Sequence, residues 1–570
     1  MEVHRIVCRP IFTFMASGMA QRMKEIWFGH KYTILSLLVL IVYAFNLGID
    51  IMEIDAAQYA AISREMAETG NYLQVYFRGQ DYLDKPPLLF WLASLGIQVL
   101  GPTTIAYKIV PMGILILGLW GTFRFASLWY DRRTGILAML IAGTTQAFYL
   151  MSNDVRTDGL LTSFVMMALW QGSCFLKREK WMYLLTTGAC IGAAMLAKGP
   201  IGLFIPLVAL GAHLMLKGHW KRIFDVRWLI LLPVIALMLA PMCYGLYTQF
   251  DLHPEKEVYG LKGPSGLGFY FWTQSFGRIT GDNPFDNNTP WYFLLQTMLW
   301  DFQPWVLLLI PAFWSRIKSL WQRTVPDYNA HEYITLSGFV IPFMAVSFSS
   351  YKLPHYIFPL LPFAAVIVAD YMMRMADRLP RWLEGVQLSV IHVLLVATIL
   401  VMLWVFPVTA PWLPILWLLL LVALWWCRKN AVDATDRWII PSVIGTVAFQ
   451  LILSVHFYPQ LLRYQSSAQV GRYIAAHHPD RVYWHDQYGY TLDYYSDRAI
   501  PNAYGPPVDT LPPGTWIWVS EKALPTMPPN NILQTYDDFR VTRLSKSFLD
   551  PKTRPGKLGK MYLIEVRSKG

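Results

Sequence analysis

The stretch TILSLLVLIVYAFNLGI, residues 33–49, decides the class of fold to which this chain belongs. It has no charged residue over about 17 positions, close to the length of α-helix that crosses the hydrocarbon core of a bilayer. Similar blocks recur, and 55% of the 570 residues are hydrophobic while only 15% are charged. Soluble domains contain about 25% charged residues. The sequence therefore predicts a polytopic α-helical membrane protein.

About thirteen transmembrane helices can be placed along residues 1–457. They cover residues 32–50, 105–129, 134–151, 159–176, 181–197, 200–216, 227–248, 291–313, 333–349, 355–373, 387–407, 411–427 and 438–457. With a cytoplasmic N-terminus and alternating spans, every basic cluster in a short loop falls on the cytoplasmic side, as the positive-inside rule expects. The net charge of +11 is then explained by basic loops, without a nucleic-acid partner.

Residues 86–100 are apolar enough to span, but counting them as a span would place the basic loops outside. We therefore expect PPLLFWLASLGIQVL to lie in the outer interface, with Pro86 and Pro87 in its first turn. Residues 51–104 become a first periplasmic loop, with a second surface helix over 57–69, and 249–290 a second large loop.

The composition changes after residue 457. Charges, prolines and glycines become more frequent, and short β-rich runs such as TWIWVS (515–520) alternate with helical or turn segments. Residues 458–570 are predicted to form a small C-terminal α/β domain in the periplasm. The five cysteines lie mostly inside apolar blocks without a CxxC pair, which indicates small core residues instead of a disulfide framework or metal site.

On this topology the polar residues that stand out lie on the outer side. They are Asp55, Tyr82, Asp84, Lys85, Asp154, Arg156, Asp158, Lys198, Arg278, Asp282, Tyr351, Lys352 and His355. Lysine and arginine bind phosphate, and an aspartate can act as a general base on a hydroxyl or amine. Acids and bases gathered beside lipid predict a site for an amphiphile with an anionic head.

Each residue also has a purely structural interpretation. Asp55 and Asp158 can cap the helices that follow them, and Lys85 can extend its amine from an interfacial helix to water. Asp154 can be a solvated loop acid, and Lys198 can anchor a helix end. These interpretations stay open, and for Asp55 both roles can hold together.

Five motifs in this order carry a resemblance. They are DAAQYAAISREMAETGNYL (55–73), YLDKPPLLFWL (82–92), RTDGLLTSF (156–164), AMLAKGP (194–200) and YKLPHYIFPLLP (351–362). Together they resemble the polyprenyl-phosphate-dependent glycosyltransferases of the GT-C class, above all the bacterial aminoarabinose transferases that modify lipid A and the related protein O-mannosyltransferases.

The resemblance implies roles for individual residues. Asp55 and Asp158 match the family's catalytic acids. The residues that match its donor phosphate site are Tyr82, Lys85, Arg278, Tyr351 and Lys352. Additional candidates are Asp84, Asp154, Lys198 and His355. Gln274 and Ser275 stand where aminoarabinose transferases tend to offer histidine.

The resemblance implies transfer of one sugar from an undecaprenyl-type phosphate carrier to an acceptor at the periplasmic face of the bacterial inner membrane. The acceptor would be lipid A or a related glycolipid, another glycan or a protein, and the mechanism would be inverting. No nucleotide fingerprint is present and no organic cofactor is implied. His253 and His485 form no ligand cluster by spacing, although a divalent metal stays possible.

Three other classes of membrane protein fit the sequence less well. A lipid or glycan transporter would need charges near the middle of its spans, whereas the acids here cluster at span ends. A glycan polymerase or ligase is also polytopic, but its loops would not show the pattern of Asp55 and Lys85. A sensor or scaffold would not need polar residues from so many loops.

Overall fold

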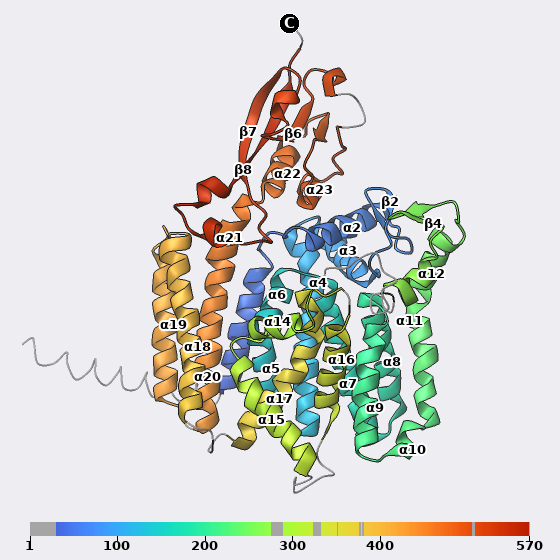
Figure 1. Ribbon diagram of the computed structural model, residues 1–570, viewed down its shortest axis with the longest axis vertical. Coiled ribbons are helices and arrows are strands. Elements are labelled where there is room, and N and C mark those ends of the chain that lie inside the picture. The colour runs from blue at the N-terminus through green and yellow to red at the C-terminus, as the bar shows by residue number, and fades with distance from the viewer. Residues whose placement is uncertain are drawn as a thin grey trace, which may run out of the picture.

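The computed structural model describes residues 30–274, 277, 289–322, 332–349, 351–375, 378, 381–431, 433–503 and 508–568. It shows a bundle of helices with a small sheet standing on one end (Figure 1). We call this the sheet end of the bundle and the other the loop end. The predicted N-terminal arm, Cys8, Arg278 and Asp282 lie outside the described residues.

Within the described ranges, eight helices are long and apolar enough to cross a membrane, so the chain is a multi-pass membrane protein. They are His30–Leu47, α4 (Thr104–Trp129), α7 (Thr157–Arg178), the α10–η2 run (Trp220–Asp251), η4–α17 (Pro354–Met375), α18–η6 (Arg381–Val405), α19 (Trp412–Lys429) and the α20–η8 run (Ala434–Tyr464). Two bent helix pairs raise the number to ten. Three more helices run beside them, α8 (Trp181–Lys198), α9 (Ile201–Leu216) and α16 (Ile334–Ser347).

The bent pairs correct two of the expected spans. Residues 134–151 were expected to be one straight span, but α5 (Arg132–Thr144) and α6 (Gln146–Asn153) meet at 61°. Residues 291–313 are likewise divided into α14 (Phe293–Asp301) and α15 (Val306–Gln322), which meet at 116°. Pro304 lies in this second break, where it has no backbone N–H for a continuing helix and disfavours helical geometry in the residue before it.

Two helices at the sheet end do not continue the bundle. α2 (Asp55–Thr69) ends at Gly70, whose φ of 71° provides the left-handed cap that favours glycine. α3 (Leu88–Leu100) begins directly after Pro86 and Pro87 and lies with α2 at the sheet end of the bundle (Figure 1). α3 packs closely on α4, because a Cβ at Gly96 would lie 2.2 Å from the carbonyl oxygen of Ala106.

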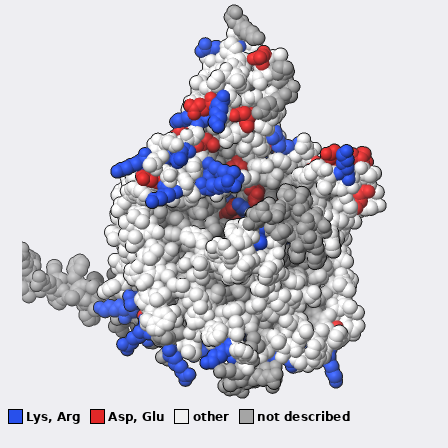
Figure 2. All heavy atoms as spheres, in the orientation of Figure 1, with Lys and Arg blue, Asp and Glu red and all other residues white. Residues whose placement is uncertain are grey.

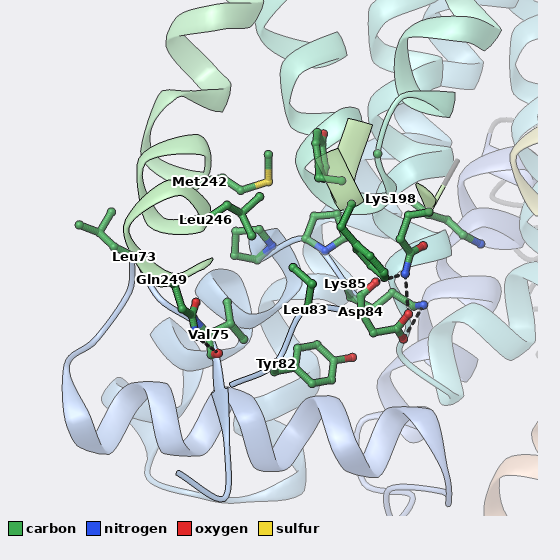
Figure 3. A pocket seen from close by; sticks show the side chains of 16 residues that line it. Leu73, Val75, Tyr82, Leu83, Asp84, Lys85, Lys198, Met242, Leu246 and Gln249 are labelled. Atoms are coloured by element: carbon green, nitrogen blue, oxygen red, sulfur yellow. Dashed lines mark hydrogen bonds and ion pairs between the residues drawn. The ribbon is translucent and has the colours of Figure 1, made fainter. Parts of the chain in front are cut away.

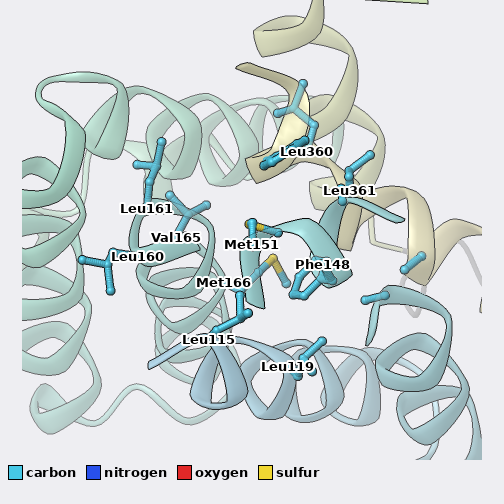
Figure 4. Packing of buried hydrophobic residues seen from close by; sticks show 14 of the residues in the cluster. Leu115, Leu119, Phe148, Met151, Leu160, Leu161, Val165, Met166, Leu360 and Leu361 are labelled. Atoms are coloured by element: carbon cyan, nitrogen blue, oxygen red, sulfur yellow. The ribbon is translucent and has the colours of Figure 1, made fainter. Parts of the chain in front are cut away.

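The bundle core is built from aliphatic and aromatic side chains of several helices. Figure 4 shows Leu115 and Leu119 of α4 facing Phe148 and Met151 of α6, with side chains of α7 beside them. Because most of these side chains are fully buried, the ends of α6 and α7 that lie at the sheet end of the bundle are held in fixed positions.

The sheet at the end of the chain has the strand order β5-β6-β8-β7. β5 (Val482–Trp484) pairs parallel with β6 (Trp516–Ser520), while β8 (Gly559–Val566) pairs antiparallel with β6 and with β7 (Asn530–Asp538). Helices α22 (Ser466–His477) and α23 (Tyr490–Tyr495) pack between the sheet and α2 (Figure 1). Two hairpins, β1–β2 (Tyr76–Phe77, Gln80–Asp81) and β3–β4 (Glu257–Val258, Leu261–Lys262), together with α12 (Gly266–Gly268) and η3 (Phe269–Thr273), complete the loops on this side.

Candidate functional site

A polar cavity of about 350 Å³ opens at the sheet end of the bundle. Its walls come from the loop after the first span, the segment between α6 and α7, the end of α8, and the segment before η4. Eight of the predicted site residues line it: Asp55, Tyr82, Asp84, Lys85, Asp158, Lys198, Tyr351 and His355. In Figure 2, red and blue side chains meet in a hollow at this level.

Asp55 is the first residue of α2, and its side chain is 42% exposed. One carboxylate oxygen, Oδ2, accepts a hydrogen bond from Nη1 of Arg156 at 2.7 Å. Nε of the same guanidinium donates to Oδ2 of Asp154, also at 2.7 Å. Arg156 therefore fixes Asp55 against the junction between α6 and α7, while the rest of the carboxylate faces the cavity.

Asp154 lies behind Arg156 and does not line the cavity. Burial raises the pKa of its carboxyl group, and the guanidinium of Arg156 opposes that rise. Oδ1 of Asp154 is buried and has no hydrogen-bond partner in the part of the chain that the structure describes. These contacts assign Asp154 to holding Arg156 in place and not to meeting a ligand.

Asp158 also lines the cavity, from the first turn of α7, and its side chain is only 4% exposed. Nζ of Lys198, at the end of α8, donates a hydrogen bond to its Oδ1. Nε2 of His355 lies 3.9 Å from its Oδ2. The amine of Lys198 also stands 4.6 Å from the ring centre of Tyr356, so this lysine is held from two sides.

Lys85 reaches the cavity from the segment before α3. Its Nζ lies 2.8 Å from Oδ2 of Asp84, and the side-chain amide of Gln274 donates to the other oxygen of the same carboxylate. Figure 3 shows Asp84 and Lys85 side by side on one segment, with Lys198 on a neighbouring element. Gln274 thus ties the lysine-bearing segment to the large loop that follows the α11 span.

An apolar groove of about 180 Å³ adjoins the polar cavity. Leu161, Ile201, Phe204 and Val346 line it, from helices α7, α9 and α16. The two spaces share Lys85, Lys198, Gln274 and Tyr356. The two lysines therefore lie where the apolar groove between the helices meets the polar cavity. A ligand with an ionic head and a hydrocarbon tail requires such a junction.

Tyrosine hydroxyls line another part of the polar cavity. Tyr82 is 3% exposed, and its hydroxyl has no hydrogen-bond partner among the described residues. Burial raises the pKa of this hydroxyl well above its usual value, so it stays neutral and can donate a hydrogen bond. Tyr59 and Tyr259 line the same cavity.

Each of the three aspartates that line this cavity forms an ion pair with a lysine or arginine side chain. Asp55 pairs with Arg156, Asp158 with Lys198, and Asp84 with Lys85. Among the described residues, no group of three histidine, cysteine, aspartate or glutamate side chains is arranged to hold a metal ion.

The family described as dolichyl-phosphate-mannose-protein mannosyltransferase matches residues 84–244. Among curated proteins, an undecaprenyl phosphate-α-4-amino-4-deoxy-L-arabinose arabinosyl transferase of Edwardsiella ictaluri is 26% identical over 56% of this chain and 55% of its own length. The protein of the same name from Pseudomonas savastanoi is 27% identical over 58% of this chain and 59% of its own length. The matched region thus spans little more than half of these relatives.

Among solved structures, ArnT from Cupriavidus metallidurans bound to undecaprenyl phosphate superimposes with a TM-score of 0.71 at 16% sequence identity. The superposition covers 94% of this chain and 98% of that protein. The chain has the GT-C fold of the aminoarabinose transferases. The fold expected from the sequence is thereby confirmed, because the superposition covers nearly all of the chain.

Within this GT-C fold, two of the predicted site residues lie elsewhere. Nζ of Lys352 is buried and donates to the carbonyl oxygen of Ser349 at 2.6 Å, so it holds the turn before η4 and does not line the cavity. Asp154 acts through Arg156. Arg278 lies outside the described residues.

Sequence reasoning also missed residues that the fold brings to the site. Arg156 lies in the RTDG motif, but the motif predicts no specific role for it. Gln274 stands out in the sequence only because aminoarabinose transferases tend to have histidine there. Tyr59 follows Asp55 by one helical turn, a spacing that places both on one face of α2. Tyr259 and Tyr356 gave no comparable signal.

The C-terminal region holds the segment that carries Asp55. The carboxylate of Glu53 accepts hydrogen bonds from the backbone N–H and hydroxyl of Thr491, at 2.7 and 2.8 Å, and from the hydroxyl of Ser467 at 3.3 Å. Gln465 accepts from the N–H of Glu53 and donates to the carbonyl oxygen of Ile51. The start of α2 is therefore fixed from the side of α22 and α23.

Proposed function

We propose that the protein is a glycosyltransferase that moves one sugar from a polyprenyl phosphate carrier to an acceptor at the membrane surface. The observation that carries this proposal is the junction of the polar cavity with the apolar groove at Lys85 and Lys198. A prenyl chain fits a groove between spans, and its phosphate would lie against the two lysines.

The chemistry follows from what faces the cavity. The acceptor hydroxyl attacks the anomeric carbon of the sugar while the bond to the carrier phosphate breaks, in one displacement with inversion. Asp55 takes the proton of the hydroxyl, and its bond to Arg156 keeps it oriented. If the acceptor is itself a phosphate, Asp55 only orients it. Lys85 neutralises the charge that develops on the leaving phosphate, with Arg278 proposed beside it.

Asp158 has a separate task in this scheme. Its pairing with Lys198 places a fixed carboxylate and amine in the same cavity as Asp55. We assign Lys198 to the donor phosphate and Asp158 to holding Lys198 and facing the sugar. No step passes through a metal, and addition of EDTA to purified protein should leave the transfer rate unchanged.

The acceptor is proposed to be lipid A or a related envelope glycolipid, and the sugar an aminoarabinose-like pentose. The names of the curated relatives support the choice of sugar and of carrier. The protein would lie in the bacterial inner membrane with its N-terminus in the cytoplasm and the sheet end in the periplasm. The basic loops at the other end support this orientation.

A second candidate is transfer to protein, which the family match over residues 84–244 favours. Mass spectrometry of envelope lipids and glycoproteins, with and without the gene, separates the two. We expect a sugar-sized mass loss on lipid A when the gene is absent. A loss confined to glycoproteins would favour the second candidate, and no change in either would overturn the glycosyltransferase proposal.

A further inference from the structure

The connection between β7 and β8 is unusually basic. Residues 540–557, RVTRLSKSFLDPKTRPGK, contain a single acid, Asp550. The basic residues of this stretch are Arg540, Arg543, Lys546, Lys552, Arg554 and Lys557. We call residues 540–557 the basic shelf. The shelf contributes nothing to the cavity described above.

The apolar side of the shelf is docked on the ends of the spans. Val541 and Phe548 are buried in one cluster with Val405, Phe406 and Phe457. The guanidinium of Arg554 lies 4.4 Å from the ring centre of Phe406 and donates a hydrogen bond to the carbonyl oxygen of Val405. These contacts position the shelf firmly against η6.

The contact with Val405 sets the depth of the shelf. Val405 is the last residue of the span Arg381–Val405. The shelf therefore lies where this span leaves the hydrocarbon, at the level of lipid headgroups. In Figure 1 it is the red segment beside α21, above α18 and α19.

The polar side of the shelf faces outward. Arg540, Arg543, Lys546, Lys552 and Lys557 are all exposed, and no ion pair involves them within the described part of the chain. The neighbouring Lys560, by contrast, is paired with Asp537. Figure 2 shows blue side chains gathered at the level of the basic shelf, directly above the broad uncharged surface of the spans.

One apolar side chain accompanies these charges. Leu544 is 45% exposed and stands between Arg543 and Lys546. An exposed leucine flanked by cations at the membrane boundary is the pattern of a segment that inserts apolar groups between headgroups while its cations meet phosphate. A patch that only served solubility would need no such leucine.

The positive-inside rule does not account for this charge. The rule explains the basic loops at the loop end, such as Lys221–Arg222 and Arg428–Lys429. The basic shelf lies at the sheet end, which that rule leaves poor in cations. We propose that the basic shelf binds the phosphate groups of anionic phospholipids in the leaflet at the sheet end. This binding would hold the C-terminal sheet on the membrane, whatever reaction the cavity performs.

The test uses full-length protein in lipid nanodiscs, made of phosphatidylcholine alone or with phosphatidylglycerol. Hydrogen exchange followed by mass spectrometry reports residues 540–557 directly. We expect these amides to exchange more slowly with phosphatidylglycerol, by about five-fold for each basic residue engaged. The difference should shrink at high salt, because salt screens exposed charges.

Matched variants assign the effect to the shelf. Arg543→Gln with Lys546→Gln should abolish most of the lipid-dependent slowing. Arg481→Gln with Arg567→Gln removes the same charge from exposed positions at the far end of the sheet and should leave the slowing intact. Exchange elsewhere in the chain checks that each variant is folded.

Three outcomes would overturn the proposal. Residues 540–557 could exchange equally in both kinds of nanodisc, or the distal variant could lose as much slowing as the shelf variant. Free inorganic phosphate could also reproduce the slowing in phosphatidylcholine alone, which would mean a site for soluble anions instead of a lipid surface.

Discussion

Two groups of charged residues lie at opposite ends of the bundle, and they differ in what surrounds them. At the loop end, Arg316 forms ion pairs with Glu332 at 2.6 Å and Asp370 at 3.2 Å, and the side chains of Arg316 and Glu332 are 2% and 0% exposed. At the sheet end, Asp55 pairs with Arg156 but keeps 42% of its side chain exposed to a cavity.

The difference shows that paired charges do not by themselves indicate a site. The loop-end group is bonded to its own members and to the hydroxyl of Tyr130, so it joins α15, α16 and α17. The sheet-end group leaves room for another molecule. The two ends should therefore respond in opposite ways to mutation, one in activity and the other in stability.

The largest effect is expected from Asp55→Asn. Loss of the base should lower the transfer rate about 10²- to 10⁴-fold, because an amide cannot accept the proton of the acceptor. The melting temperature should stay near that of the wild type, since the carboxylate is exposed on one side. Transfer of radiolabelled sugar in proteoliposomes measures the rate, and full activity would remove Asp55 from the mechanism.

The matching change at the loop end is Glu332→Ala. It leaves Arg316 without its nearest partner in a buried place and should cost about 3–5 kcal/mol of stability. Thermal unfolding in detergent measures the loss, with Glu332→Gln as the control that keeps a hydrogen-bond acceptor. A folded and stable Glu332→Ala protein with impaired donor binding would contradict the comparison.

Lys85→Ala sharpens the comparison within the sheet end. A charge-assisted hydrogen bond to phosphate contributes about 1.5–3 kcal/mol, so kcat/KM for the lipid donor should fall about 10- to 100-fold. Lys352→Ala is the control, because that lysine holds a carbonyl oxygen outside the cavity. Equal losses of donor use in the two variants would argue against the phosphate role of Lys85.

The smallest effect is expected from Thr491→Val, which removes one of the hydroxyl groups that donate a hydrogen bond to the carboxylate of Glu53. A neutral hydrogen bond contributes about 1 kcal/mol, so kcat should fall a few-fold as the start of α2 loosens, with KM for the donor unchanged. Thr515→Val removes a buried hydroxyl just before β6 that donates a hydrogen bond to the carbonyl oxygen of Pro512, and it should leave kcat intact. An unchanged kcat for Thr491→Val would contradict the role of the C-terminal region in positioning Asp55.

Much of the fold could be predicted because the bilayer imposes it. Apolar blocks such as residues 33–49 must be helices, and the basic loops fix their direction. The strands over residues 482–484, 516–520 and 559–566 were predicted from their β-rich composition. β7 was not, because NNILQTYDD has few β-branched residues and is a strand only through its pairing with β8. The breaks at Thr145 and Pro304 were not predicted, although Pro304 is a local signal for the second one.

By itself, the sequence determined that this chain is a bundle of spans with polar loops gathered on one side, because hydrophobicity and charge are local properties that lipid and water sort directly. Only the tertiary structure decided which of those polar residues meet. Lys352 and Lys85 each come shortly before a proline, yet Lys352 donates to a carbonyl oxygen outside the cavity and Lys85 lines the cavity. Arg156 joins two acids that lie 101 and 2 residues away. Such partners are chosen by the packing of whole helices, which no short stretch of sequence records.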